Sequence, residues 1–247
     1  MHAHTAIAAQ PTRVLPGPKA SAMPMPRVAP SRTPVGTAAT AASTDIDPLA
    51  TIAQLRVFDR EQAIFAEGEA ADAVFRVVDG MIRLYKLLPD GRRQIIGFLQ
   101  AGDMVGLAFA DRYLYSAEAI TASTVQRIPR SQLDALLDAQ PALARRLLSV
   151  TTSELVAAQD QMLLLGRKSA LEKLASFLLA LGRRAGSGRT IALPMSRCDI
   201  ADHLGLTTET VSRGFTKLKT SRLIRILDGG RVELLDAEAL AELADCA

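Results

Sequence analysis

Cysteine and histidine are scarce in this chain of 247 residues, which contains two cysteines and three histidines. The two cysteines, Cys198 and Cys246, cannot form a disulfide framework or a four-cysteine metal site. The three histidines, His2, His4 and His203, are too few for a histidine-rich metal site. We therefore expect no bound metal.

Long apolar runs are also missing. No run approaches the roughly 18 residues that a membrane-spanning helix needs, and the N-terminus lacks the apolar core of a secretory signal. A nucleophile elbow, a phosphate-binding loop, a dinucleotide fingerprint and a plausible pair of catalytic carboxylates are absent as well. These absences predict a cytoplasmic protein that is not an enzyme, has no catalytic residues and binds no membrane.

Acidic residues are absent before Asp45, and residues 1–47 hold seven of the twelve prolines. Alanine, serine and threonine fill much of this segment, which shows neither a helical nor a strand period. It cannot bury enough apolar surface to offset the entropy lost on ordering. We expect residues 1–47 to form a disordered tail.

The net charge of +3 is unevenly distributed. Residues 48–165 carry 12 Lys and Arg against 14 Asp and Glu, whereas residues 166–226 carry 12 against 4, which gives net charges of −2 and +8. A basic segment of this size suggests a polyanionic partner, most simply nucleic acid. On charge alone, a soluble surface that happens to be basic explains the pattern equally well.

Residues 48–140 have the pattern of an antiparallel barrel or sandwich. Short apolar runs alternate with turn sequences at about ten-residue spacing, among them Asp79-Gly80 and Pro89-Asp90-Gly91. The expected strands cover residues 76–78, 81–86, 94–99 and 119–128.

Helices are expected from about residue 130 onward. Ser131 is a plausible N-cap for a helix over 132–139, and Pro141 suits the first turn of a long helix over 141–165. Along this helix an apolar stripe recurs at intervals of three, four or seven, which is typical of a seam between two helices. The stripe consists of Leu143, Leu147, Val150, Ala157, Gln161 and Leu164. It predicts a dimerisation helix, followed by another helix over 169–183.

Residues 196–219 predict a helix-turn-helix. Ser196 can cap a first helix, with Asp199 at its third position. Gly205 stands where the chain must leave that helix with a positive φ angle, and Thr207 can cap the second helix. Residues 223–226 and 231–234 flank a turn, which predicts a hairpin wing, and Asp236 can cap a short last helix.

The exposed face of the second helix has the chemistry of a DNA reader. Arg213 can donate two hydrogen bonds to guanine, Glu209 can accept one from cytosine, and Ser212 can reach a base. The expected phosphate contacts are Thr208, Thr216, Lys217 and Lys219. The alternative is an ordinary amphipathic helix pair with a solvated charged face.

With these residues in view, the sequence resembles the CRP/FNR family of bacterial transcription regulators over residues 55–245. The segment from Asp199 to Arg213 matches the FNR-type recognition pattern, in which Ser and Arg follow a Glu by three and four residues. The resemblance implies an α+β fold: a β-roll like cyclic-nucleotide-binding domains over 48–140, a long dimerisation helix over 141–165 and a winged helix-turn-helix over 166–247. It also implies a homodimer that reads palindromic TTGA-type sites through Glu209, Ser212 and Arg213.

Departures from the family pattern narrow the prediction. No cysteine precedes Cys198, so the iron–sulfur sensor of FNR is absent. Leu107 and Tyr115 stand where cyclic-AMP receptors place a Glu and an Arg, and a buried phosphate would lack its charged partner there. The chain therefore most resembles the FixK-like branch, which implies no bound cofactor and control of low-oxygen or nitrogen-fixation genes.

Three further interpretations stay open. One is a regulator of the same family gated by an unidentified small molecule in the β-roll, for which Arg76, Arg83 and Ser116 are scattered candidates. Cys198, in a first helical turn beside Arg197, is favoured as a thiolate and is a candidate redox switch near DNA, the alternative being a cysteine without a role. The exposed turn over 88–92 is a candidate contact for RNA polymerase, or simply a hairpin turn.

Overall fold

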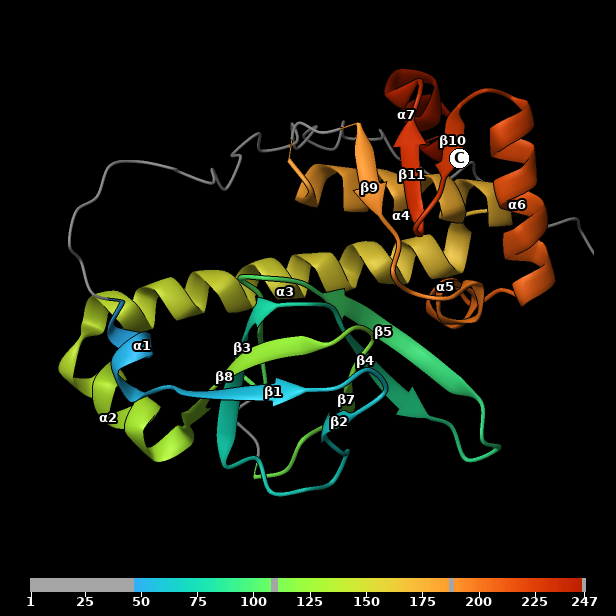
Figure 1. The fold of residues 1–247 in the computed structure, drawn as a ribbon. Helices are drawn as coiled ribbons and strands as arrows, with labels where there is room; N and C mark the ends of the chain where they lie inside the picture. Colours follow the sequence, from blue (N-terminus) through green and yellow to red (C-terminus); the bar gives the residue numbers. More distant parts are fainter. Residues whose placement is uncertain (1–46, 108–110, 187–188, 246–247) are drawn as a thin grey trace, which may run out of the picture. The chain divides into compact units, whose positions relative to one another are not determined.

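The computed structural model describes residues 47–107, 111–186 and 189–245. The tail expected over residues 1–47 lies, up to residue 46, outside this part of the chain. The first half consists mainly of strands and the second mainly of helices (Figure 1). The elements of the first half are α1 (Pro48–Ile52), β1 (Gln54–Phe58), β2 (Ala63–Phe65), β3 (Ala73–Asp79), β4 (Ile82–Leu87), β5 (Arg93–Leu99), β6 (Met104–Val105), β7 (Ser116–Ala119) and β8 (Ser123–Pro129).

These strands form a β-roll of two antiparallel four-stranded sheets. One sheet has the order β1-β8-β3-β6 and the other β2-β7-β4-β5. Apolar side chains from both sheets share one core, which includes Phe75 and Val77 of β3 together with Ile82 and Leu84 of β4. The chain passes from one sheet to the other at Gly80, where φ is +90° and a Cβ atom would lie 2.3 Å from Ser123 Oγ, so no larger residue fits without rearrangement.

The prediction of one strand over residues 119–128 is wrong. β7 ends at Ala119 and β8 begins at Ser123, and the two strands belong to different sheets. Two hydrogen bonds hold the turn between them to the residue before β4. The Ile120 N–H donates to the Met81 carbonyl, and the Thr121 hydroxyl accepts from the Met81 N–H. The run is apolar enough for one strand, but these long-range hydrogen bonds turn the chain.

The second half follows the expected order of helices with one additional strand. Its elements are α2 (Arg130–Ala139), α3 (Pro141–Arg167), α4 (Ala170–Arg184), β9 (Thr190–Ala192), α5 (Arg197–Leu204), α6 (Thr208–Thr220), β10 (Ile224–Leu227), β11 (Arg231–Leu234) and α7 (Ala237–Asp245). β9 pairs with β11 and extends the predicted hairpin to three strands. Ser131 is not the cap of α2, because the helix already begins at Arg130 after Pro129 and has no side-chain cap.

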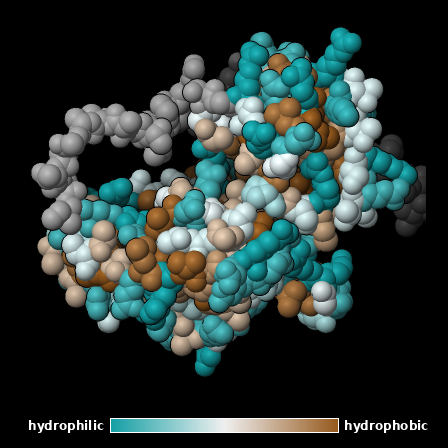
Figure 2. Space-filling view, viewed as in Figure 1, coloured by the Kyte–Doolittle hydropathy of each residue, from teal (hydrophilic) through white to brown (hydrophobic). Residues whose placement is uncertain are grey.

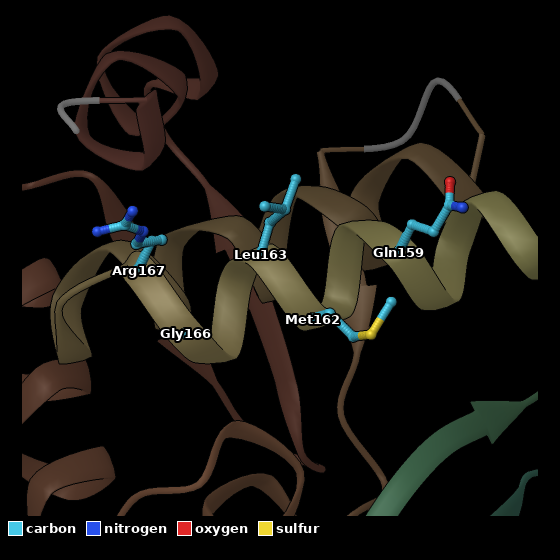
Figure 3. Close-up of a pocket in the computed structure, with 5 residues that line it drawn as sticks. All are labelled: Gln159, Met162, Leu163, Gly166 and Arg167. Carbon is cyan, nitrogen blue, oxygen red and sulfur yellow. The ribbon is translucent and has the colours of Figure 1, made fainter.

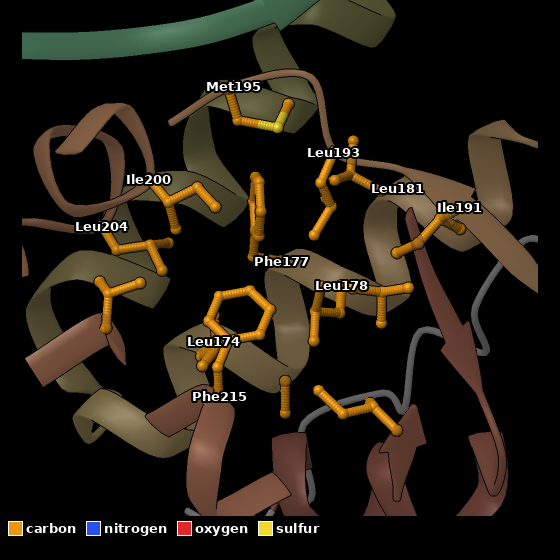
Figure 4. Packing of buried hydrophobic residues seen from close by; sticks show 14 of the residues in the cluster. Leu174, Phe177, Leu178, Leu181, Ile191, Leu193, Met195, Ile200, Leu204 and Phe215 are labelled. Carbon is orange, nitrogen blue, oxygen red and sulfur yellow. The ribbon is translucent and has the colours of Figure 1, made fainter. Parts of the chain in front are cut away.

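The helices of the second half pack around an apolar core that also includes residues of the β-roll (Figure 4). Leu174 and Leu178 of α4, Ile200 and Leu204 of α5 and Phe215 of α6 are almost completely buried there. Burying one such side chain contributes about 1.5–3 kcal/mol, and the shared core therefore fixes α5 and α6 as one rigid pair.

Four of the six residues of the predicted seam contact the chain itself, whereas Val150 is half-buried and Ala157 is exposed. Leu143 and Leu147 are buried against α1 and α2, Leu164 packs on the core of the second half, and the Gln161 side chain donates to the His203 carbonyl at 3.2 Å. The exposed apolar side chains of α3 lie on its opposite side and are Leu148, Leu155, Val156, Met162 and Leu163. The helix has two apolar faces, and its periodicity does not show which one the chain covers.

Candidate nucleic-acid interface

The first helix of the candidate site, α5, begins as predicted. The Ser196 hydroxyl accepts a hydrogen bond from the Asp199 backbone N–H at 3.0 Å, and the Asp199 carboxylate accepts one from the Ser196 N–H at 3.0 Å. This reciprocal capping box satisfies two N–H groups that the helix itself leaves unpaired. At the other end Gly205 adopts φ +61° and ψ +44° and releases the chain toward α6.

The second helix, α6, is oriented by its apolar side. The Thr207 hydroxyl caps it by accepting from the Thr210 N–H at 3.1 Å, and Val211, Phe215 and Leu218 are buried in the core. Because these three residues occupy one side of the helix, the polar residues between them face outward.

The structure brings five of the predicted DNA contacts together in one shallow groove along α6. These are Glu209, Ser212, Arg213, Thr216 and Lys217. Thr208 and Lys219 are exposed but do not line this groove. Thr220 and Ser221 do line it and were not predicted. Thr220 follows Thr216 by four residues, so the helical period could have identified it.

The two charged residues that are expected to contact bases pair with each other. Arg213 Nη2 donates to Glu209 Oε1 at 2.5 Å, although their side chains are 79% and 72% exposed. The Ser212 hydroxyl donates to the Thr208 carbonyl at 2.8 Å. An exposed ion pair of this kind contributes at most about 1 kcal/mol, so base edges in a groove can displace it at small cost.

The excess of basic residues is only partly available to a polyanion. Lys168 donates to the Ala244 carbonyl at 2.6 Å, and Arg184 pairs with Asp103. The Arg197 guanidinium covers the Phe215 ring at 3.2 Å from its centroid. The structural roles of these three cations explain part of the charge asymmetry without DNA.

Cys198 occupies the first turn of α5 and is exposed. Its neighbours in sequence, Arg197 and Asp199, are both turned into contacts within the chain. The thiol is therefore accessible to solvent reagents on a helix that directly precedes the reader helix.

The two positions of the β-roll at which cyclic-AMP receptors carry a Glu and an Arg lie in apolar surroundings here. Four aromatic rings gather there: Phe65 lies 3.9 Å from Tyr113, 5.5 Å from Phe75 and 6.1 Å from Tyr115 between ring centroids. Leu107, which stands where cyclic-AMP receptors carry a Glu, packs in an apolar cluster. A nucleotide phosphate would meet rings and aliphatic groups rather than a cation.

The three polar candidates for a β-roll ligand do not converge. Arg76 bonds to Gln126 at 2.7 Å and pairs with Asp47, whereas the Ser116 hydroxyl accepts from the Glu67 N–H at 3.0 Å. Arg83 is 6% exposed and is engaged by carboxylates from other elements. Each group thus already has its own partner.

Within residues 47–107, 111–186 and 189–245, no three His, Cys, Asp or Glu side chains cluster as metal ligands would. Nor does any helix there have the length and apolar character needed to cross a membrane.

Comparison with known proteins agrees with this architecture. Residues 55–140 match the model of the cyclic nucleotide-binding domain, and residues 172–243 match that of the Crp-like helix-turn-helix domain. The β-roll and the capped helix pair correspond to these two matches.

The similar proteins are transcription regulators. The chain is 47% identical over 204 residues to the transcriptional activatory protein AadR of Rhodopseudomonas palustris, covering 81% of this chain and 85% of AadR. It is 45% identical over 191 residues to the nitrogen fixation regulation protein FixK of Bradyrhizobium diazoefficiens, covering 76% and 80% of the two chains. The structure of FixK2 from Bradyrhizobium japonicum superposes with a TM-score of 0.76 at 41% identity, covering 79% of this chain and 99% of FixK2. With both domain matches and these relatives, the chain belongs to the CRP/FNR family of helix-turn-helix transcription regulators, in its FixK-like branch.

Proposed function

We propose that this regulator binds palindromic TTGA-type DNA sites as a homodimer without a bound cofactor and activates genes for low-oxygen metabolism or nitrogen fixation. The observation that carries the proposal is the open groove on α6, where Glu209, Ser212 and Arg213 lie together and exposed. The physiology is supported by relatives named as a transcriptional activator and as nitrogen fixation regulators. Because its target is chromosomal DNA, the protein acts in the cytoplasm.

In this proposal the residues of α6 divide into two groups. Arg213 donates to guanine O6 and N7, Glu209 accepts from cytosine N4 and Ser212 reaches a neighbouring base. Thr208, Thr216, Lys217 and Lys219 contact phosphates and position the helix without reading sequence. Thr208 and Lys219 are exposed and lie outside the groove.

Replacing Arg213 should relax the preference for guanine. We expect Arg213→Ala to cost about 1–3 kcal/mol on a TTGA palindrome because a bidentate base contact is lost. Fluorescence anisotropy at fixed salt, on the palindrome and on a scrambled duplex, measures the effect. Lys217→Ala is the matched control and should weaken both duplexes equally. If Arg213→Ala keeps wild-type affinity and preference, it is not a base reader.

The dimer seam in this proposal is the exposed side of α3. Leu148, Leu155 and Met162 follow one another at intervals of seven residues and are 66%, 59% and 65% exposed. Figure 3 shows Met162 and Leu163 projecting from the C-terminal half of the helix, where they line a groove with Gln159, Gly166 and Arg167. A seven-residue apolar repeat is self-complementary between two identical helices, which favours a second copy of this chain as the partner.

A charge on this seam should separate the protomers. We expect Leu155→Glu to shift the protein from dimer to monomer in sedimentation equilibrium, because two buried carboxylates would face each other across the seam. Ser153→Glu is the control: it adds the same charge at an exposed position of α3 that lies off the seam. A dimer of undiminished stability in Leu155→Glu would move the interface elsewhere.

Cys198 is proposed as a redox switch. Oxidation of this exposed thiol adds bulk and negative charge on the helix that precedes the reader, close to where phosphates would lie. We expect peroxide to weaken palindrome binding by wild type and to leave Cys198→Ser unaffected, with mass spectrometry reporting the oxidation state. Unchanged binding by protein shown to be oxidised at Cys198 would remove the switch.

The alternative function is that of a regulator gated by a small molecule bound in the β-roll. The aromatic filling of the β-roll and the separate engagement of Arg76, Arg83 and Ser116 both count against a converging polar site. Micromolar binding of a cyclic nucleotide in calorimetry would restore the alternative.

RNA polymerase is the proposed second partner, contacted through the turn between β4 and β5. Asp90 and Arg92 are exposed there and form an ion pair of 2.7 Å with each other, so both remain accessible to another protein. We expect the double change Asp90→Ala and Arg92→Ala to reduce transcription in a purified system while DNA affinity stays at the wild-type level. Unchanged transcription would exclude this turn as the contact.

A further inference from the structure

The first helix of the helix-turn-helix, α5, packs directly against the β-roll. The His203 ring lies 5.2 Å from the Phe98 ring of β5 and 5.6 Å from the Phe177 ring of α4, between centroids. Its Nδ1 donates to the Ile95 carbonyl at 3.1 Å, and burial lowers the pKa of the imidazole. Ile95 and Phe98 belong to the same apolar cluster as the reader core. One continuous core therefore joins the helix-turn-helix to the β2-β7-β4-β5 sheet.

Four charged side chains reinforce this contact and are called here the ion-pair cluster: Arg83, Arg93, Asp199 and Asp202. Arg83 of β4 and Arg93 of β5 both donate to Asp199 Oδ1, at 3.0 and 2.7 Å. Arg93 Nε also donates to Asp202 at 2.9 Å. Asp199 and Arg83 are 3% and 6% exposed, so the centre of the cluster is dry. Two successive turns of α5 are thereby tied to two neighbouring strands.

Carboxylates within the β-roll hold Arg83 in place. Its Nη2 donates to Glu118 of β7 at 2.6 Å and to Glu61 at 2.9 Å. Glu61 adopts a φ of +64°, a left-handed conformation that non-glycine residues seldom take. Strain of this kind persists where the surrounding structure requires it, and here it places a carboxylate on the guanidinium.

Stability alone does not account for the ion-pair cluster. Buried ion pairs are often no more stabilising than apolar residues of the same volume, and Arg83 Nε is buried without a partner in the described part of the chain. A planar guanidinium does restrict where its carboxylate partners can lie, because its N–H donors point in fixed directions. The cluster engages α5 only, so the groove on α6 stays open toward solvent.

We propose that the ion-pair cluster positions the helix-turn-helix so that both reader helices of a dimer are set for palindromic DNA without any effector. This inference rests on the proposed palindromic binding. Two half-sites lie about 34 Å apart, and the two readers must match that separation together. If only a fraction of molecules holds the correct pose, the apparent dissociation constant rises by the inverse of that fraction. Arg83, Arg93, Asp199 and Asp202 are thus positioning residues.

Arg93→Gln is the informative variant, because Arg93 is partly exposed and its loss leaves the Arg83 contact to Asp199 intact. The matched control is Arg127→Gln, which breaks a 2.7 Å ion pair with Asp72 inside the β-roll only. Arg127 and Arg93 side chains are 26% and 23% exposed, so the two changes are comparable. Thermal unfolding of the full chain verifies that both variants fold.

Anisotropy on three duplexes measures positioning: a TTGA palindrome, the same palindrome with one base pair added between half-sites, and a single half-site. We expect Arg93→Gln to bind the palindrome about five- to tenfold more weakly than wild type does. The variant should lose less affinity than wild type when the spacer is lengthened. Its affinity for the single half-site should equal that of wild type. Arg127→Gln should match wild type throughout. Wild-type behaviour of Arg93→Gln overturns the inference, and so does tighter palindrome binding, which would make the contact inhibitory.

Hydrogen exchange of the DNA-free chain gives a second readout that is independent of the DNA site. We expect Arg93→Gln to speed exchange in residues 93–99 and 197–204 and Arg127→Gln to leave these segments unchanged. If wild type binds palindrome and scrambled duplex equally, the proposed DNA site is wrong and exchange alone decides the inference. Equal exchange in wild type and Arg93→Gln would contradict it.

Discussion

The Asp199 carboxylate is the group on which the arrangement of the reader depends. One oxygen accepts from the Ser196 N–H and hydroxyl and starts α5, while the other accepts from Arg83 and Arg93. Burial by itself raises the pKa of Asp199, but the Ser196 hydrogen bonds and the two guanidinium charges outweigh burial and lower it. The carboxylate therefore stays ionised while it links the helix cap to the β-roll. The same side chain thus both caps the helix and contacts two strands of the β-roll.

The long helix α3 serves two apolar surfaces at once. Leu143, Leu147 and Leu164 pack on their own chain, whereas Leu148, Leu155 and Met162 remain exposed on the other side. Apolar side chains at the surface also occur over the β1 region of the β-roll, where Leu55 and Val57 are exposed (Figure 2). Leu148, Leu155 and Met162 recur every seven residues along α3, and this repeat is the reason that we propose α3 as the homodimer seam.

The β-roll keeps the fold of a nucleotide-binding domain with different chemistry inside. Residues 55–140 match the cyclic nucleotide-binding model, yet rings of Phe65, Tyr113 and Tyr115 fill the space between its sheets. Arg83, the one deeply buried arginine among the described residues, pairs with Asp199 of α5 and with Glu61 and Glu118 of the β-roll.

Local sequence patterns determined most of the candidate site. The caps at Ser196 and Thr207, the left-handed turn at Gly205 and the reading face of α6 depend on contacts within four residues, so periodicity and residue type suffice to predict them. The order of the helices from residue 130 onward and the wing hairpin were predictable for the same reason. These features require no knowledge of the rest of the chain.

Only the tertiary structure decided the features that depend on contacts between residues far apart in the sequence. The turn that splits residues 119–128 depends on hydrogen bonds to Met81, and the covered face of α3 depends on what packs beside it. Arg83 and Asp199 are 116 residues apart in the chain, and their pairing depends on how the core joins α5 to β4 and β5. Side-chain charge shows that an arginine needs a partner, but only the folded chain selects which carboxylate is near enough to bind it.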